Sequence, residues 1–504
     1  LHFHFKMNIT NSDNCDVCIK PEFIGEKENK EKKELGVNTW HGIKYDQPIQ
    51  LCQSIQRGQE CTRKQCNRVH DIAKYLQERP APLDIECPNI KKFGYCEYSY
   101  SCIFSHPVEQ QDKAKNSKPE YLNNIALKQI KDYDYSQPST QKEKKFDPRG
   151  KLILAPMCTV GTMPFRRWCK RFGCDVTCSE MIFARGLVGK QIEPMEIAKL
   201  RRHPEEDIFG LQLTGNASEL SQCIKMLNEL CTYDYVELNA GCPQEVATDR
   251  KCGFQIAQEG KIKVCMEKMA EQTTKQNMCL SLKTRIADFQ GESRIEALLA
   301  KELVAGVDNI TLHGRSAKQR YQKNADYKVL EKFGIDVKQS KPDICFTVNG
   351  DLFDVPHYLK VLEDGWTDAF LIGRGALVKP WIFQEFKEKR VMDPSSQQRK
   401  EWMQEFANLC IEYFGTDRMG IERAREQFLE NYVYMCRYVP VGILESPQLL
   451  NQRNVVFKGR DDLETLFGSQ NVEDWVKVTE MFFGPVPPGF LYQPKHKSKG
   501  SYQK

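Results

Sequence analysis

Between residues 151 and 377 the chain repeats one pattern, a short apolar run followed by a stretch with apolar residues at helical spacing. Spacers such as 217–230 and 293–306 place apolar residues three or four positions apart, which is typical of amphipathic helices. The apolar runs lie at 151–156, 175–181, 207–215, 234–239, 279–286, 308–315, 344–351 and 368–377. Apolar strands that alternate with helices are typical of a parallel sheet covered on both faces. Eight such units predict an α/β fold, a (β/α)₈ TIM barrel over residues 148–388.

A doubly wound open sheet is the alternative arrangement of these units. No G-x-G-x-x-G motif follows the first apolar run, which disfavours a dinucleotide-binding sheet. After about residue 390 the apolar residues recur only at helical spacing, as in 401–414 and 423–439. This predicts a separate helical domain over 389–490, followed by a basic tail over 491–504.

Upstream of the barrel the composition divides the chain into three parts. Residues 1–45 are polar with mixed-charge runs, and we expect them to be disordered. Residues 111–147, rich in Lys, Gln, Ser and Pro, are typical of a linker. Between them, 46–110 holds two similar sets, Cys52-x8-Cys61-x4-Cys66-x3-His70 and Cys87-x8-Cys96-x5-Cys102-x3-His106. Three thiolates and one imidazole complete a tetrahedral shell around Zn²⁺, so the block predicts two zinc ions.

The two sets resemble CCCH zinc fingers, a class that binds single-stranded RNA. Aromatic rings that can stack on bases interleave the second set, namely Phe93, Tyr95, Tyr98, Tyr100 and Phe104. The first set carries cations that suit phosphates, namely Arg57, Arg63, Lys64 and Arg68. We expect this block to bind RNA, and packing of the rings around the zinc ions is the alternative.

The composition is that of a globular protein, with 504 residues of which 40% are hydrophobic and 28% charged. No apolar run reaches the roughly 18 residues that cross a membrane. There are 21 cysteines and no signal-peptide pattern before them, which indicates a reducing compartment. We therefore expect a cytoplasmic or nuclear protein. The net charge of +5 permits a nucleic-acid partner without requiring one.

The C-terminal ends of the strands carry the chemistry in a (β/α)₈ barrel. Polar and small residues stand at these ends, namely Pro156-Met157-Cys158, Gln212, Asn239, Cys242, Lys283, Arg285, His313, Arg315, Asn349-Gly350-Asp351 and Gly373-Arg374. Backbone amides at Gly350 and at Gly373-Arg374 can cradle a phosphate. Lys283 and His313 would stand beside it, where a cation stabilises the N1–O2 edge of a reduced flavin.

One cysteine differs from the others by its setting. The apolar run 234–239 ends on Asn239, and Gly241-Cys242-Pro243 follows. A thiol with a pKa of ~8.5 is protonated at neutral pH and can donate a proton. No His lies nearby in the sequence to turn it into a nucleophile. We expect Cys242 to act as a general acid. Asn239 has the donor and acceptor that suit an amide-like ring.

Together these motifs resemble the flavin-dependent tRNA-dihydrouridine synthases. The segments that carry the resemblance are LAPMCTVGTMPFRRWCKRFG, EDIFGLQLTG, ELNAGCP, LKTRI, TLHGRSAKQRY, VNGD and IGRGALVKPWIF, in this order. The two CCCH sets, with RYVPVGILE and GPVPP downstream, resemble the type-3 eukaryotic branch.

The resemblance implies reduction of the C5–C6 bond of a uridine in the variable loop of tRNA, at position 47, by an FMN enzyme that uses NADPH or NADH. Cys242 would give a proton to C5 while FMN N5 gives a hydride to C6, and the helical domain would bind tRNA. Messenger RNA is left open as a further substrate. Asn239 and Arg315 would contact the substrate. The residues that would bind FMN are Pro156, Met157, Cys158, Gln212, Lys283, His313, Asn349, Gly350, Asp351, Gly373 and Arg374.

One segment departs from the family pattern. After GCP the family has a glycine-rich stretch, whereas residues 244–258 read QEVATDRKCGFQIAQ. The altered loop 247–254 bears on substrate entry, and Cys252 is a second candidate thiol, although the intact motif around Cys242 favours Cys242. Two other functions stay open. One is a non-catalytic RNA-binding protein that retains an FMN barrel, and the other is an FMN reductase of a small pyrimidine.

Overall fold

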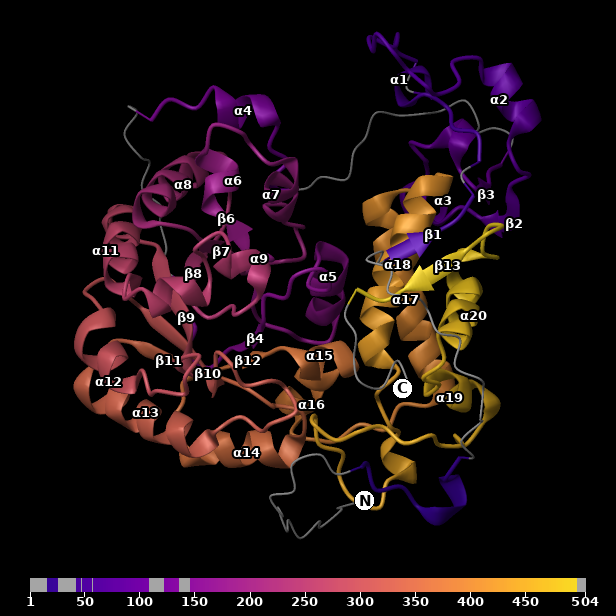
Figure 1. Cartoon of the computed structure of the whole chain (residues 1–504). Coiled ribbons are helices and arrows are strands. Elements are labelled where there is room, and N and C mark those ends of the chain that lie inside the picture. Colours follow the sequence, from indigo (N-terminus) through magenta and orange to yellow (C-terminus); the bar gives the residue numbers. More distant parts are fainter. Residues whose placement is uncertain are drawn as a thin grey trace. The chain divides into compact units, whose positions relative to one another are not determined.

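The computed structural model describes residues 16–25, 42–46, 48–56, 58–107, 122–135 and 146–495. The chain divides into two compact units (Figure 1). The barrel unit comprises Leu1–Cys18, Tyr121–Met392 and Leu444–Arg453, and the second unit comprises Ile19–Glu120, Asp393–Ile443 and Asn454–Lys504.

Eight parallel strands form the barrel, and they coincide with the eight apolar runs. They are β4 (Leu152–Leu154), β5 (Thr177–Cys178), β7 (Phe209–Thr214), β8 (Tyr235–Asn239), β9 (Cys279–Ala287), β10 (Asn309–Ser316), β11 (Cys345–Asn349) and β12 (Ala369–Ile372). Their order is β4-β12-β11-β10-β9-β8-β7-β5, and β6 (Ile182–Phe183) also pairs with β7. A parallel bridge between Ile153 and Val176 joins the two ends of this order. The predicted (β/α)₈ barrel is confirmed.

Helices surround the strands in Figure 1. They include α5 (Met163–Arg171), α6 (Ala184–Val188), α7 (Pro194–Lys199), α8 (Ala217–Leu230), α11 (Ile262–Thr273), α13 (Tyr327–Ser340), α14 (Val355–Asp364) and α16 (Ile382–Glu388). Asn216 and Glu219 form a capping box that starts α8 where the pattern predicts it. The predicted helix at 293–306 is wrong in its extent. There the chain forms only α12 (Ile295–Ala297) and a π-helical turn at Leu298–Glu302.

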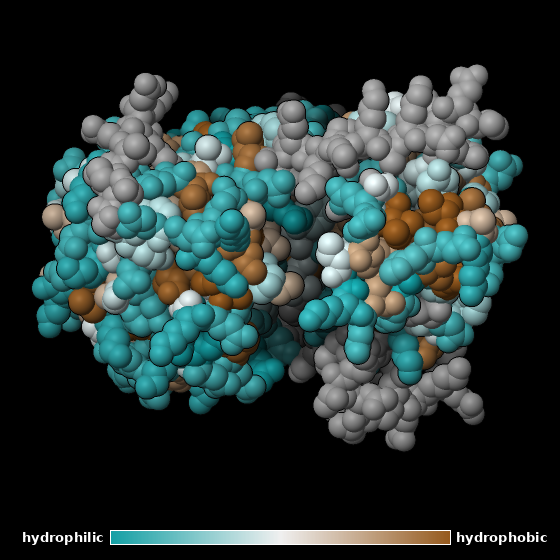
Figure 2. Space-filling view, turned by 90° about the horizontal axis from the view of Figure 1, so that it is seen from above, coloured by the Kyte–Doolittle hydropathy of each residue, from teal (hydrophilic) through white to brown (hydrophobic). Residues whose placement is uncertain are grey.

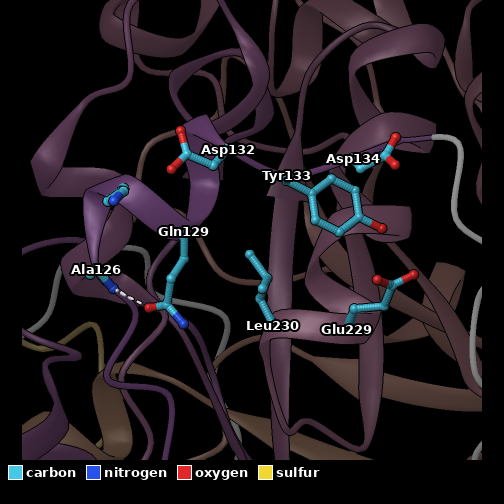
Figure 3. Close-up of a pocket in the computed structure, with 8 residues that line it drawn as sticks. Ala126, Gln129, Asp132, Tyr133, Asp134, Glu229 and Leu230 are labelled. Atoms are coloured by element: carbon cyan, nitrogen blue, oxygen red, sulfur yellow. Dashed lines mark hydrogen bonds between the residues drawn. The ribbon is translucent and has the colours of Figure 1, made fainter.

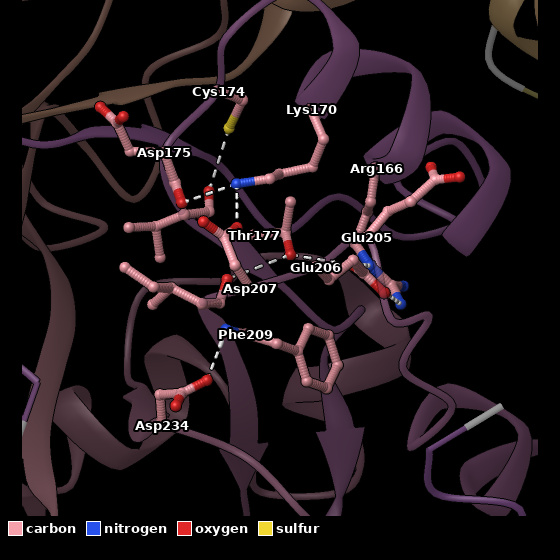
Figure 4. Close-up of polar contacts among 12 residues, drawn as sticks. Arg166, Lys170, Cys174, Asp175, Thr177, Glu205, Glu206, Asp207, Phe209 and Asp234 are labelled. Carbon is pink, nitrogen blue, oxygen red and sulfur yellow. Dashed lines mark hydrogen bonds and ion pairs between the residues drawn. The ribbon is translucent and has the colours of Figure 1, made fainter. Parts of the chain in front are cut away.

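A polar network lies where the chain enters strands β5 and β7 (Figure 4). The Arg166 guanidinium donates to the Glu206 carboxylate at 2.6 Å, and both side chains are buried. The Thr177 hydroxyl donates to the same carboxylate at 2.8 Å. A buried pair with additional hydrogen bonds is tolerated because each charge is compensated. Because the network is at the N-terminal ends of the strands, its role is stability.

The second unit combines helices with residues from the start of the chain. Its helices are α17 (Ser396–Phe414), α18 (Arg418–Met435), α19 (Asp462–Phe467) and α20 (Val472–Phe483). At the start of the predicted basic tail, β13 (Leu491–Gln493) pairs antiparallel with β1 (Gly42–Lys44). The same pairing corrects the expectation of disorder for 42–44. The basic tail from residue 496 onward lies outside the described residues.

Part of the predicted linker packs on the barrel unit. The side chain of Asn123 is buried, and it donates to the carbonyl of Leu200 at 2.9 Å and accepts from the backbone N–H of Thr232 at 2.7 Å. Helix α4 (Leu127–Lys131) follows. Residues 122–135 of the predicted linker are therefore attached to the barrel unit. The other linker residues up to 145 lie outside the described residues.

Most of the described surface in the view of Figure 2 is hydrophilic. Among the described residues no helix combines the length and the apolar character that a membrane span requires.

Candidate active site

The turn that carries Cys242 is built on the last residue of β8. The side-chain oxygen of Asn239 accepts hydrogen bonds from the backbone N–H groups of Gly241 and Cys242, each at 3.0 Å. The Asn239 amide nitrogen donates to the side-chain oxygen of Gln212 at 2.8 Å. Both ends of the Asn239 amide are therefore engaged, and the turn is fixed relative to the strand. The Cys242 side chain is half-buried.

A buried carboxylate continues this chain of hydrogen bonds into the barrel. The Gln212 amide donates to Glu237 at 2.7 Å, and the Ser281 hydroxyl donates to the other carboxylate oxygen at 2.9 Å. Burial raises the pKa of Glu237, although Lys283 opposes this increase. Because its neighbours fix both ends of its amide, Gln212 supports Asn239. The predicted contact of Gln212 with FMN stays a prediction.

The altered loop holds the Cys242 turn from the other side. The backbone N–H of Phe254 donates to the carbonyl of Cys242 at 2.8 Å. Gly253 has a φ of +60°, and a Cβ there would lie 2.5 Å from the same carbonyl oxygen. Glycine is therefore required at this position. Cys252 packs in a cluster with Met181, and burial raises the pKa of its thiol to about 11. Cys252 is buried, whereas Cys242 is partly accessible.

Cationic groups gather at the C-terminal ends of β9 and β10. Burial lowers the pKa of Lys283 to about 8, and Arg285 adds to this decrease while Glu237 opposes it. The pKa of His313 is well below its usual range because of burial and the nearby Arg285, Lys283, Arg315 and Arg374. His313 is thus neutral at pH 7. Its Nε2 accepts from the Arg315 guanidinium at 3.3 Å, because arginine can only donate.

Asp351 joins the loops that follow β10, β11 and β12. One carboxylate oxygen accepts from Arg374, and the other accepts from Arg315, each at 2.5 Å. The backbone N–H of Ala325 donates to the second oxygen at 2.7 Å. Asp351 has a φ of +47°, a conformation that is unusual outside glycine and is found at functional sites.

Arg315 lies beneath this cluster. Its side chain is fully buried, and it donates twice to the carbonyl of Lys323, at 2.8 and 2.6 Å. Its other contacts are those to Asp351 and His313 described above. These contacts make Arg315 a support of the loop after β10, so its predicted contact with the substrate gains no support and stays a prediction.

The remaining predicted residues surround the mouth of the barrel, which is the face formed by the C-terminal ends of the strands. Pro156 and Met157, after β4, are half-buried, and Cys158 is exposed. The Asn349 amide donates to the carbonyl of Leu371 at 2.9 Å, which links the ends of β11 and β12. A Cβ on Gly350, which has a φ of +135°, would lie 2.7 Å from the Cβ of Ala325. The fold thus brings every predicted barrel residue to the C-terminal ends of the strands.

Two residues of the mouth were given no role by the sequence reasoning. Arg285 donates to the carbonyl of Gly241 at 2.7 Å and so braces the Cys242 turn from β9. The ring of Tyr321, 53% exposed, lies 4.1 Å from the guanidinium carbon of Arg374. No spacing in the sequence marks the contact between Tyr321 and Arg374, because Arg374 follows another strand. The position of Arg285 at a strand end was the available signal for that residue.

A pocket of about 500 Å³ lies on the outside of the barrel between α4 and α8 (Figure 3). It is lined by acidic groups and Tyr133, including Asp132, Asp134 and Glu229. Glu229 is at the C-terminal end of α8. Because barrel helices run antiparallel to the strands, that end faces away from the catalytic side. This pocket is therefore not the active site.

The eight predicted zinc ligands form two clusters. Within each set the candidate ligand atoms lie within 4.8 Å of one another. The sulphurs of Cys52 and Cys66 are 3.9 Å apart, and those of Cys87 and Cys102 are 3.7 Å apart. Tetrahedral Zn–S bonds of about 2.3 Å place two sulphurs about 3.8 Å apart. The donor sets therefore fit Zn²⁺.

The two sets differ in burial. The three cysteines of the second set are buried, and Cys96 lies 3.1 Å from the hydroxyl of Thr416, between α17 and α18. The backbone N–H of Ile103 donates to the carbonyl of Thr416 at 2.9 Å, and Lys92 pairs with Glu412 at 2.7 Å. The second set is thus packed against the helices. In the first set His70 is exposed and Cys61 is half-buried.

Two aromatic rings of the second set pack within the second unit. Phe104 is buried, and the hydroxyl of Tyr98 packs against Gly415. Tyr95 and Tyr100 are half-buried, while Phe93 is 38% exposed. Base stacking stays a prediction, with Phe93 as its most accessible ring. The cations Arg63 and Lys64 of the first set are exposed, and Arg57 lies outside the described residues.

The fold is a (β/α)₈ barrel. The C-terminal ends of its strands carry a thiol on the loop after β8 and a group of cations at the ends of β9 to β12, which is the arrangement of an enzyme. Residues 153–436 match the model of the dihydrouridine synthase family, Dus. A Xenopus tropicalis protein named tRNA-dihydrouridine(47) synthase [NAD(P)(+)]-like is 32% identical over 95% of this chain and 85% of its own length. The human protein of the same name is 32% identical over 86% of this chain and 78% of its own. The chain belongs to the dihydrouridine synthase family.

Proposed function

We propose that this protein reduces the C5–C6 double bond of a uridine in tRNA to dihydrouridine, and that the uridine is position 47 in the variable loop. Family membership and the names of the relatives support the reaction. The observation in this molecule that carries the proposal is the fixed turn of Cys242, whose thiol is partly accessible beside Lys283 and Arg285. This is the arrangement expected of a proton donor to a bound base.

Cys242 gives its proton to C5 of the uracil. Hydrogen bonds from Gly241 and Cys242 to Asn239 orient the thiol before the substrate arrives, and such orientation is a large part of general acid catalysis. To reach the thiol, the uridine must leave its stack. The buried Cys252 thiol is held by the carbonyl of Arg250 at 3.3 Å and plays no part in the transfer.

The residues at the strand ends fit FMN. Lys283, Arg285, Arg315 and Arg374 converge around His313, whereas Glu237 and Asp351 are their carboxylate partners there. This excess of buried positive charge suits an anionic cofactor. FMN, when bound and reduced by NADPH or NADH, supplies the hydride for C6 of the uracil. Lys283 would hold a positive charge at the flavin edge, and Gly350, Gly373 and Arg374 would hold the phosphate, with the other predicted residues around them.

The second unit binds the RNA. Arg63 and Lys64 of the exposed first zinc set contact phosphates, while zinc in the second set stabilises the packing against α17 and α18. We place the protein in the cytoplasm, the nucleus or both, because the cysteines of the described residues form no disulfides. Messenger RNA is a further substrate class under this proposal.

The deciding experiment follows flavin reoxidation. The purified protein is reduced anaerobically with NADPH, unmodified tRNA is added, and dihydrouridine is mapped. Reoxidation with a new dihydrouridine at position 47 supports the proposal. A reduced flavin that tRNA does not reoxidise, but a free pyrimidine does, would favour the reductase of a small pyrimidine. RNA binding without reoxidation by either would favour the non-catalytic alternative.

A further inference from the structure

Residues 444–453 belong to the barrel unit, although they stand in the sequence between segments of the second unit. Asn451 lies in this segment and reaches the loop that follows β11. Its side-chain amide donates to the carboxylate of Asp351 at 3.1 Å. The amide also donates to the side-chain oxygen of Asn324 at 2.6 Å. The segment is thereby attached to two loops at the C-terminal ends of the strands.

Asn451 contacts both members of the Asp351–Arg374 ion pair. While its nitrogen donates to Asp351, its oxygen lies 3.4 Å from the Arg374 guanidinium, at the long end of a hydrogen bond. A primary amide can donate to the acid through its nitrogen and accept from the base through its oxygen at once. With the Tyr321 ring on one side and Asp351 on another, Arg374 is held in a single orientation.

We propose that Asn451 is a positioning residue of the phosphate end of the FMN site. It acts through Arg374 and Asp351, and it connects the segment 444–453 to the cofactor site through this one side chain. This inference rests on the proposed function, because it takes the loops after β11 and β12 as the phosphate cradle. It deepens that function by assigning a role to a segment of the chain that lies outside the barrel sequence.

The inference is tested by flavin release from the full-length protein. The rate at which FMN leaves on dilution is followed by the recovery of flavin fluorescence, and the dissociation constant is measured by equilibrium dialysis. Asn451→Ala should weaken FMN binding about tenfold, the effect expected for losing a hydrogen bond to charged groups. Asn451→Asp should weaken it further, because a second carboxylate would stand beside Asp351. High salt should recover part of the loss in Asn451→Asp only.

Riboflavin, which lacks the phosphate, separates positioning from general structure. Asn451→Ala should leave the dissociation constant of riboflavin unchanged, and an equal loss for both ligands would overturn the inference. Leu449→Ala is the matched control, because Leu449 is 45% exposed in the same segment. Its backbone N–H, and not its side chain, donates to the side-chain oxygen of Gln452. An equal loss of FMN in Leu449→Ala would also overturn it.

The FMN assignment and the role of Asn451 are contradicted by different results. Wild-type protein that binds no FMN would overturn the cofactor assignment and the role of Asn451 together. Wild-type protein that binds FMN, with Asn451→Ala equal to it, would overturn only the role of Asn451. Thermal unfolding of each variant checks that the segment is still folded.

Discussion

The side-chain oxygen of Asn239 accepts the backbone N–H of Cys242 at 3.0 Å, so the residue that ends β8 also shapes the turn that presents the thiol. The sequence suggested Asn239 as a contact for the uracil ring. The structure adds that both ends of its amide are engaged within the protein, the oxygen by two backbone N–H groups and the nitrogen by Gln212. The Asn239 side chain therefore fixes the position of the Cys242 sulphur.

Cys242→Ala should keep its flavin and lose turnover by a factor of about 10² to 10⁴, the contribution of a positioned general acid. Turnover is measured as tRNA-dependent oxidation of NADPH, and flavin content is measured by absorbance. Cys252→Ala is the control, and we expect it to retain most of the activity because that thiol is buried. Full turnover in Cys242→Ala would contradict the assignment of Cys242 as the general acid.

Gly253→Ala should reduce turnover while the protein stays folded, because a Cβ at this position forces the Cys242 carbonyl to move. Gly260→Ala is a matched control. Gly260 has a φ of +65°, close to the +60° of Gly253, but its Cβ would meet nothing within 4 Å. Both substitutions carry a backbone strain of about 1 kcal/mol or more. Only the first should lower the rate of proton transfer, and equal rates in the two variants would contradict the role of Gly253.

Lys283 should give the pH–rate profile an alkaline limb, which is a fall in the reaction rate as the pH rises. Its pKa is lowered to about 8, so above that pH the folded protein loses the positive charge at the flavin edge. Bound reduced flavin favours the charged amine, which places the limb at or above pH 8. Lys283→Arg keeps a cation at every working pH, so its limb should move to higher pH, where only the loss of the Cys242 proton still lowers the rate. An unchanged limb in Lys283→Arg would assign it to another group.

The same shift has a consequence for stability. Between about pH 8 and the ordinary value of 10.5, the unfolded chain binds a proton at Lys283 that the flavin-free folded chain does not. The contribution of Lys283 to the free energy of unfolding therefore rises with pH across this window. Urea unfolding of wild type and Lys283→Met at pH 7.5 and 10 measures the difference between their free energies of unfolding. The stability that wild type loses relative to the variant should become smaller as the pH rises.

The two zinc sets should respond differently to removal of a ligand. Cys96→Ser and Cys61→Ser should each reduce the zinc content from two ions to one. Only Cys96→Ser should lower the melting temperature of the second unit strongly, because Cys96 is buried beside Thr416 between two helices. Zinc content is measured by mass spectrometry and unfolding by calorimetry. Both variants should keep FMN in the barrel. Equal destabilisation would show that the first set is as structural as the second.

The barrel was predictable because its signals are local. Eight apolar runs separated by helical spacing leave few other folds, and residues at the ends of parallel strands must meet at one face of a barrel. The zinc sets were predictable for a similar reason, since the four donors of each set lie close together in the chain. The split of 293–306 into a short helix and a π-helical turn was not predictable, because apolar spacing alone does not distinguish these conformations.

The sequence by itself determined which residues stand at the strand ends, the zinc donor sets and the family motifs, since each of these is written in short segments. The tertiary structure decided how those residues are used. The burial of Arg315, the joining of three loops by Asp351 and the arrival of Asn451 at the same carboxylate depend on contacts between residues up to 100 positions apart. No local pattern encodes such contacts, because they form only when separate elements pack together.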